Sequence, residues 1–370
     1  MVKRILVLGG YGNFGSHIAR TLAPNAAIQL LIAGRSFERA SAVATSLEAA
    51  NPPEAHKIAI DHGLDEALRA AAPHMVIHTA GPYQGQSYRV AEACIGAGCH
   101  YVDLADGRAF VAGIDALDAQ ARAADVLVVS GASSVPCLTA AIIDEALPRF
   151  GNLTDVDYGI SAAQQTNRGL ATASSVLSYV GRPFTTLRNG SAGTIYGWQD
   201  LHAERYPELG PRLFGNCDIP DLELFPKRYP TLRNIRFCAG HEIKLLHLAT
   251  WLLSWGVRAK VLPSPGDHSD RLLKWSFLFD PMGSSRSGFH MFLNGKGRDG
   301  RDRAERFYII ARQGQGPFIP CTPAIILAER LARGKLIQRG ARPCLDLIAL
   351  NEFLKSLEHL DISIVREAPE

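Results

Sequence analysis

The sequence predicts an α/β protein in which an N-terminal doubly wound domain is followed by a second α+β domain built on a mainly antiparallel sheet. Two observations predict this order. Apolar, strand-like runs alternate with helix-like segments through the first 130 residues. After about residue 150 the chain becomes richer in polar strands, aromatic residues, glycine and proline. A length of 370 residues is enough for two domains, each with its own core.

Six runs in the first part are predicted to be buried parallel strands, because a strand covered on both faces is continuously apolar. They are residues 4–8, 28–33, 57–60, 75–78, 100–103 and 126–129. Apolar positions at three- and four-residue spacing predict the intervening helices at 15–23, 36–49, 87–96 and 112–124. Crossover helices would align the carboxyl ends of the strands at one edge, where such sheets bind ligands.

The first domain is assigned to residues 1–135 and the second to 136–318. A helix is expected from the start of the second domain to about residue 150. Its strands are expected at 155–162, 193–198, 272–280, 289–297 and 305–313. This sheet is a candidate for a substrate pocket and a subunit interface, which would make the protein a homodimer. Residues 319–370 are expected to form helices, at 323–334 and 347–360, that return to the first domain.

The stretch GGYGNFG at residues 9–15 follows the first strand and contains two overlapping fingerprints. Gly10, Gly12 and Gly15 form the GxGxxG turn of a Rossmann fold, with Asn13 and Phe14 inside it. Such a turn brings backbone N–H groups and a helix N-terminus to a pyrophosphate. Gly9, Gly12 and Gly15 have instead the spacing of short-chain reductases, which also need Tyr-x-x-x-Lys. None of the ten tyrosines has lysine four residues later, so the Rossmann turn is favoured.

The end of the second strand predicts which dinucleotide is bound. NAD-specific folds usually place an acidic residue there, whereas this chain has Gly34, Arg35 and Ser36. A guanidinium and a hydroxyl suit a 2′-phosphate, so NADP is predicted over NAD. Arg35 as a solvated residue at a helix start stays open. Asp61 follows the third strand, where it would contact adenine or cap a helix.

Five motifs occur in order over residues 2–145: LVLGGYGNFG, AGR, HTAGPYQGQ, EACIGAGCHYVDLADG and GASSVPCLTAAIIDE. With them the chain resembles the saccharopine dehydrogenase-like family, in its NADP-binding domain. The resemblance implies an NAD(P)-dependent oxidoreductase that moves a hydride to or from a small substrate, such as an amino-acid-derived imine or secondary amine. By resemblance and by position, the nicotinamide side is lined by Thr79, Ala80, Gly81 and Pro82.

Three residues are candidates for catalysis. Tyr83 would donate a proton or simply pack. Asp103 shares a strand face with Tyr101 and would orient an amine, relay a proton, or cap the next turn. Arg168, in a polar loop of the second domain, would clamp a carboxylate or lie in a plain surface loop. His78 is interpreted as a core histidine.

Cys137 supports an alternative function. It opens the helix after Ser-Ser-Val-Pro, and a helix N-terminus would activate it as the nucleophile of a semialdehyde or acyl-thioester reductase. No partner histidine can be identified, so a small buried cysteine is favoured. A protein that binds NADP as a sensor without turnover is the third alternative.

Composition excludes several other classes. The net charge of +3 does not indicate nucleic acid. Residues 245–257 are interpreted as a buried helix, because they carry His247 and fall short of the roughly 18 apolar residues of a membrane span. We therefore expect a cytoplasmic protein without a signal peptide or a membrane partner. Seven cysteines without a CxxC pair indicate reduced thiols and no metal site.

Overall fold

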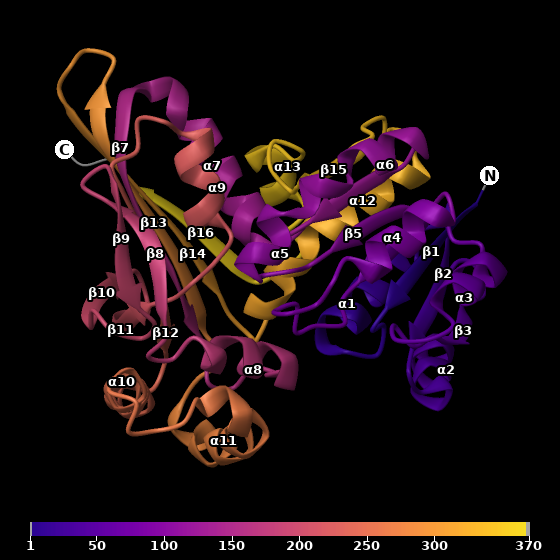
Figure 1. Ribbon diagram of the computed structural model, residues 1–370, viewed down its shortest axis with the longest axis horizontal. Coiled ribbons are helices and arrows are strands. Elements are labelled where there is room, and N and C mark those ends of the chain that lie inside the picture. The colour runs from indigo at the N-terminus through magenta and orange to yellow at the C-terminus, as the bar shows by residue number, and fades with distance from the viewer. Residues whose placement is uncertain (1, 368–370) are drawn as a thin grey trace. The chain divides into compact units, whose positions relative to one another are not determined.

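The computed structural model describes residues 2–367 and divides into two units (Figure 1). The first unit, here called the nucleotide unit, comprises Met1–Leu138 and Phe318–Ser356. The second unit comprises Thr139–Pro317 and Leu357–Glu370. Each unit is therefore assembled from two separate stretches of chain, and the two are described separately below. Met1 and residues 368–370, the end of the predicted helical tail, lie outside the described residues.

A seven-stranded sheet forms the centre of the nucleotide unit, in the order β15-β6-β5-β4-β1-β2-β3, and every neighbouring pair is parallel. This is the doubly wound arrangement that the sequence predicts. The strands are β1 (Lys3–Leu8), β2 (Ile28–Gly34), β3 (Glu54–Lys57), β4 (Met75–His78), β5 (His100–Asp103), β6 (Leu127–Ser130) and β15 (Gly340–Pro343).

Helices cover this sheet on both faces. Their bounds are α1 (Asn13–Leu22), α2 (Phe37–Ser46), α3 (Leu64–Ala71), α4 (Arg89–Gly96), α5 (Arg108–Ala112), α6 (Asp118–Ala123), α12 (Thr322–Ala332) and α13 (Leu350–Lys355). One buried cluster joins Leu6, Leu31 and Val76 of the sheet to α3, α4 and α6. Helix α12 packs against α1 and β1 instead. The continuous apolar strands thus have a helical layer on each side, as a parallel sheet requires.

The third strand lies earlier in the chain than the sequence predicts. It spans Glu54–Lys57, paired with the end of β2, and not residues 57–60. The apolar residues that suggested a strand, Ile58 and Ile60, follow the ladder and pack into the core beneath it. Since β3 is an edge strand, its own residues need not be apolar.

A second seven-stranded sheet, in the order β10-β11-β12-β7-β13-β14-β16, forms the centre of the second unit. Five of its neighbouring pairs are antiparallel, and the pair of β12 and β7 is parallel. The strands are β7 (Phe150–Ala162), β10 (His202–Tyr206), β11 (Gly210–Asn216), β12 (Asn234–His241), β13 (Ser287–Gly297), β14 (Asp302–Ala311) and β16 (Ile362–Glu367). The predicted α+β domain with a mainly antiparallel sheet is confirmed.

The remaining elements of the second unit are a small hairpin and five helices. They are β8 (Pro183–Arg188), β9 (Ser191–Tyr196), α7 (Thr139–Ala146), α8 (Leu170–Ser178), α9 (Asp221–Arg228), α10 (Lys244–Arg258) and α11 (Ser269–Ser276). Figure 1 shows α10 and α11 beyond the ends of the strands, where α10 contacts β11 and β12.

Two predictions about this unit are wrong. Residues 272–280 are not a strand but the end of α11 and a following 3-10 turn, Phe277–Met282. Their half-buried positions, Leu272, Leu273 and Ser276, recur at helical spacing. Residues 245–257 do form a helix, α10, but it is not buried, because only His247 and Ser254 among its residues lie inside.

Residues 319–370, which were predicted to form helices that return to the first domain, also contain two strands. Besides α12 and α13 they include β15, which extends the parallel sheet next to β6. The last strand, β16, pairs with β14 in the second unit. Residues beyond Ser356 therefore belong to a different unit from those before it.

Candidate cofactor and active site

The turn between β1 and α1 has the geometry that a pyrophosphate needs. Backbone N–H groups of Gly9 and Gly10 donate to Ala33 O at 2.8 and 3.1 Å, which ties the turn to β2. A Cβ on Gly15 would collide with Gly9 O and lie 2.8 Å from Gly10 Cα, so helix and turn approach too closely for any side chain. Helix α1 begins without a side-chain cap and without an acidic residue in its first turn. Its first N–H groups and its dipole are thus suited to an anion.

A cationic surface lies at the end of β2. Arg35 is exposed and forms no ion pair or hydrogen bond with another described residue. The guanidinium of Arg39 lies 4.4 Å from the centre of the Tyr11 ring, and the Tyr11 hydroxyl accepts a hydrogen bond from Ser36 N at 3.3 Å. Two guanidiniums beside a helix start fit the 2′-phosphate of NADP.

Glu38 adds a negative charge to that surface. The hydroxyl of Ser36 caps α2 by accepting from Arg39 N and donates to Glu38 Oε2 at 2.8 Å. Sequence reasoning named Arg35 and Ser36 but missed Tyr11, Glu38 and Arg39. Arg39 lies one helical turn after Arg35, and this spacing was the available signal.

The loop after β4 lies beside the glycine turn. Thr79 donates to Leu8 O through both its backbone N, at 2.8 Å, and its hydroxyl, at 3.0 Å. The side-chain amide of Gln86 donates to Ala80 O and Pro82 O, which folds residues 79–82 back on themselves. The structure thus brings the predicted nicotinamide-side loop to the same sheet edge as the glycine turn. Asp61 is exposed in the bend after β3 and has no bonded partner in the described chain.

A buried polar group lies at the carboxyl ends of β4 and β5. His78 Nδ1 and Tyr101 OH are 3.0 Å apart, and Tyr83 OH donates to His78 O at 2.6 Å. Burial lowers the pKa of His78 to about 4, so the ring is neutral. Burial, and then the nearby Asp103, raise the pKa of Tyr83 well above its usual value. His78 is therefore a core histidine. Tyr83 packs against it, and its hydroxyl hydrogen is already used in the hydrogen bond to His78 O.

Asp103 is fully buried at the end of β5. Its Oδ1 accepts from Gly131 N at 2.8 Å, Ala105 N at 2.9 Å and Ser130 Oγ at 3.0 Å. Its Oδ2 has no hydrogen-bond partner among residues 2–367. Burial raises the pKa of Asp103 to about 6, although the hydrogen bonds to Oδ1 oppose the shift. One oxygen thus holds the loops after β5 and β6 together, while the other retains the capacity to exchange a proton.

Arg168 lies in the second unit, in the loop between β7 and α8. Its Nη2 donates to Asp280 Oδ1 at 2.5 Å, and its guanidinium lies 4.6 Å from the centre of the Phe277 ring. Nε is buried without a partner in the described chain. Arg168 is thus part of a packed ion pair, and a substrate carboxylate would have to replace Asp280 to be clamped by it.

The thiol of Cys137 is not activated. It is buried in the turn Ser134–Leu138, and a hydrogen bond with Cys344 together with burial raises its pKa well above the usual value. A nucleophilic cysteine needs the opposite shift. All seven cysteines are buried and none forms a disulfide. The structure therefore supports the small buried cysteine over the thioester nucleophile.

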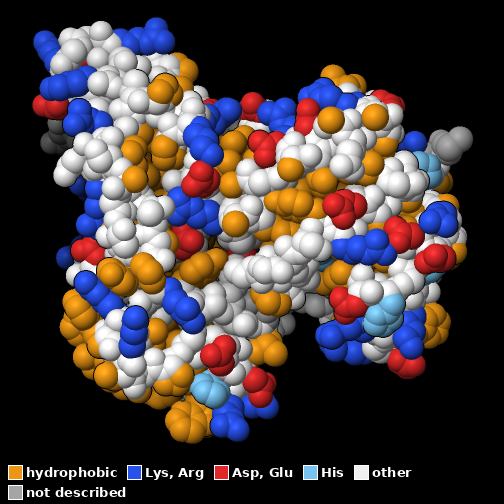
Figure 2. All heavy atoms as spheres, viewed as in Figure 1, with side chains coloured by type: hydrophobic (Ala, Val, Ile, Leu, Met, Phe, Trp, Pro, Cys, Tyr) orange, Lys and Arg blue, Asp and Glu red, His pale blue; other side chains and the backbone are white. Residues whose placement is uncertain are grey.

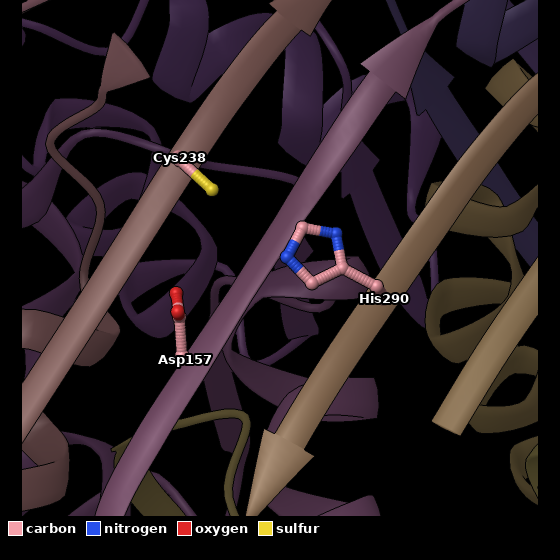
Figure 3. A group of neighbouring side chains, drawn as sticks. All are labelled: Asp157, Cys238 and His290. Carbon is pink, nitrogen blue, oxygen red and sulfur yellow. The ribbon is translucent and has the colours of Figure 1, made fainter. Parts of the chain in front are cut away.

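Asp157, Cys238 and His290 form a second polar cluster on three neighbouring strands of the second unit (Figure 3). Their ligand-type atoms lie within 4.8 Å of one another. Both Asp157 oxygens accept from Arg236, and Cys238 Sγ donates to Tyr158 O at 3.2 Å. A guanidinium beside these atoms opposes binding of a second cation. We therefore describe this cluster as a packed polar centre.

Comparison with known proteins identifies the nucleotide unit. Residues 5–129 match the family model described as saccharopine dehydrogenase NADP binding domain. This match covers the glycine turn, the Arg35 surface and the loops after β4 and β5. The N-terminal domain is a saccharopine dehydrogenase-like NADP-binding domain. The chain is accordingly an NAD(P)-dependent oxidoreductase, and NADP is its cofactor.

Solved structures show the extent of the shared fold. Saccharopine dehydrogenase (L-Glu forming) from Saccharomyces cerevisiae is 13% identical with a TM-score of 0.69, over 99% of this chain and 100% of that one. A mutant meso-diaminopimelate dehydrogenase from Clostridium tetani is 13% identical with a TM-score of 0.44, over 95% of each chain. The first of these two likenesses shows that a saccharopine dehydrogenase-like fold extends over both units. No curated protein sequence matches the chain.

Among residues 2–367, no helix has both the length and the apolar character needed to cross a bilayer.

Proposed function

We propose that this saccharopine dehydrogenase-like chain transfers a hydride between NADP and a small amino-acid-derived imine or secondary amine. The nicotinamide, when bound, supplies or accepts the hydride, and the protein has to hold the dinucleotide and manage a proton. The observation that carries the proposal is the uncapped start of α1 beside the glycine turn, together with unpaired Arg35 at the end of β2.

We assign the 2′-phosphate to Arg35, Ser36 and Arg39. Replacing Arg35 by Asp puts a like charge beside the phosphate, and an acid at this position suits the ribose hydroxyls of NAD. We expect Arg35→Asp to weaken NADPH binding by roughly tenfold to a hundredfold and to leave NADH binding unchanged or improved. The measurement is calorimetric titration with both nucleotides.

The matched control is Arg69→Asp, which reverses the charge of an exposed arginine on α3. It should leave both affinities unchanged. If Arg35→Asp retains the NADPH preference of the original chain, the assignment of Arg35 is wrong.

We assign proton handling to Asp103. It lies at the sheet edge with the NADP loops, its Oδ2 has no partner in the described chain, and its pKa is raised to about 6. A carboxyl group poised near neutral pH suits general acid–base catalysis. Asp103→Asn should keep NADPH binding while turnover falls by roughly two orders of magnitude and loses its pH dependence near pH 6. An unchanged pH profile in that variant would refute this role.

Turnover itself separates the enzyme from the sensor alternative. NADPH oxidation should appear with imines from a panel that also contains carbonyl compounds and enoyl thioesters. Arg168→Lys should then raise the KM of carboxylate-bearing imines, because a lysine cannot reproduce a bidentate clamp. NADPH binding without oxidation of any panel member would favour the sensor. Light scattering of the full chain in solution tests the proposed homodimer.

A further inference from the structure

The segment from α10 to the turn after α11, residues 244–282, exposes an unusual amount of apolar surface. Ten of the sixteen exposed large hydrophobic side chains of the described chain lie in it. They are Leu245, Leu248, Leu252, Trp255, Val261, Leu262, Trp275, Phe277, Leu278 and Met282. Contiguous apolar patches on soluble monomers rarely exceed a few hundred Å², and larger ones mark interaction surfaces. Figure 2 shows hydrophobic side chains, in orange, gathered over the region of α10 and α11.

The apolar side chains of α10 form a stripe. Leu245, Leu248, Leu252 and Trp255 follow helical spacing on the outer face. The opposite face holds buried His247, whose ring centre lies 5.4 Å from that of Trp198. An amphipathic helix normally turns such a stripe toward the core, but here the stripe faces outward.

Polar contacts hold this segment in place, so its outward face is built into the fold. Arg258 donates to Gln199 Oε1 at 2.7 Å, and its guanidinium lies 3.8 Å from the centre of the Tyr196 ring. Gln164 donates to Ser276 O at 2.7 Å. The segment is thus anchored from inside at both helices.

Four side chains project far from the surface. Leu278 is 77% exposed, Val261 75%, Trp275 70% and Met282 67%. Apolar side chains exposed to this degree are free to insert into a soft apolar medium such as the interface of a bilayer. Tryptophan, leucine and phenylalanine are also the residues that anchor proteins at bilayer interfaces.

The charges of the segment favour an anionic partner. It carries five basic residues and three acidic ones, a net charge of +2. Lys244, Lys260 and Arg271 have no acidic partner in the described chain. Of the three acidic residues, Asp280 is paired with Arg168 and Asp270 with Lys274, and Asp267 alone forms no ion pair with a described residue. A second copy of the same surface would bring like charges together, whereas anionic lipid headgroups complement them.

We propose that the α10–α11 segment docks the protein on an anionic lipid surface, with its apolar side chains inserted at the boundary between headgroups and acyl chains. Lys244, Lys260 and Arg271 contact the headgroups. From the sequence we expected no membrane partner, because residues 245–257 are too short to span a bilayer, and docking on a membrane surface departs from that expectation. This mode of binding requires no helix long enough to cross the bilayer.

The test is flotation of the full chain with vesicles. One set contains phosphatidylcholine alone, and the other contains phosphatidylcholine and phosphatidylglycerol at roughly two to one. We expect strong binding to the anionic set, weak binding to the neutral set, and weakening by salt. The double variant Trp275→Ser and Leu278→Ser should bind at least about tenfold more weakly. Lys260→Glu with Arg271→Glu should lose the preference for anionic vesicles.

The matched control is Ile337→Ser, because Ile337 is also 77% exposed but lies in the nucleotide unit. It should bind vesicles like the original chain, and all variants should keep the circular dichroism spectrum and the denaturation midpoint of the original chain, which shows that they are folded. Absence of flotation, or equal binding to both vesicle sets, would overturn the proposal. So would light scattering that shows a dimer in solution which the Trp275→Ser and Leu278→Ser variant dissociates, because a second copy would then occupy this surface.

Discussion

Two fully buried aspartates, one in each unit, have raised pKa values but differ in their hydrogen-bond donors and in their place in the fold. Asp103 ends β5 in the nucleotide unit, and Asp221 begins α9 in the second unit. Burial raises the pKa of Asp103 to about 6 and that of Asp221 to about 7. In each, one carboxylate oxygen accepts hydrogen bonds and the other has no partner among the described residues.

They differ in what donates to them and where they lie. Two of the three donors to Asp103 are backbone N–H groups of loops at the ligand-binding edge of the sheet. Asp221 Oδ2 accepts only from hydroxyls, Thr139 Oγ1 at 2.6 Å and Tyr158 OH at 2.9 Å, and thereby joins α9 to α7 and β7. A raised pKa therefore does not by itself identify a functional site. Asp103 differs from Asp221 because it lies at the ligand-binding edge of a parallel sheet.

The largest expected effect is the loss of either carboxylate. Asp103→Ala leaves the N–H groups of Gly131 and Ala105 buried without an acceptor, and backbone donors cannot turn away. We expect the free energy of unfolding to fall by about 3–5 kcal/mol. Asp221→Ala leaves two hydroxyls that can rotate, and should cost about 1–3 kcal/mol. Urea denaturation of both variants measures this, and equal losses would break the distinction between backbone and hydroxyl donors.

The dependence of stability on pH should be similar in size. Both carboxyls hold their proton more tightly in the folded chain than in the unfolded chain, where the pKa is near 3.8. Their contribution to stability is therefore complete below about pH 4 and declines as pH rises, to about pH 6 for Asp103 and about pH 7 for Asp221. The decline is roughly 1.4 kcal/mol per pH unit within each window.

Substitution by asparagine removes this decline. The stability of Asp221→Asn relative to the original chain should rise between about pH 4 and pH 7, and that of Asp103→Asn should stop rising earlier, near pH 6. Denaturation midpoints across this range measure both. A constant difference over the whole range would show that neither carboxyl titrates as described.

The smallest effect should come from removing a single hydroxyl donor. Ser130→Ala leaves Asp103 two backbone donors, whereas Thr139→Val leaves Asp221 only Tyr158. Each should cost about 1 kcal/mol of stability. The pKa of Asp221 should rise more than that of Asp103, because it loses half of its donors to Oδ2. Carboxyl titration followed by nuclear magnetic resonance would measure both shifts, and a larger rise at Asp103 would contradict the comparison.

The sequence predicted the parallel sheet and the cofactor turn because both depend on local signals. A continuously apolar run predicts a strand buried on both faces, and the glycine spacing at residues 9–15 predicts a dinucleotide-binding turn. Asp221 was not found, because Thr139 and Asp221 lie 82 positions apart and Tyr158 and Asp221 lie 63 apart. Such a contact depends on the packing of α7, β7 and α9, which no local pattern contains.

The α10–α11 segment shows the limit of apolar patterns more sharply. Its leucines and tryptophans follow the helical spacing of a core helix, so residues 245–257 were predicted to be buried. Hydrophobic spacing shows which side chains share a face, but not what covers that face. Residues 272–280 show a second limit, because a short apolar run does not by itself distinguish a strand from a helix.

The strands β15 and β16 have a consequence for how the protein is made. The nucleotide unit is completed only by residues 318–356, and β16 completes the second sheet with residues 362–367. During synthesis, the edge of β6 and then that of β14 remain uncovered until these late residues emerge. Uncovered edges invite pairing with other nascent chains. A chain released before residue 340 is made would therefore have two open sheets, and it should depend on chaperones far more than a chain that contains both β15 and β16.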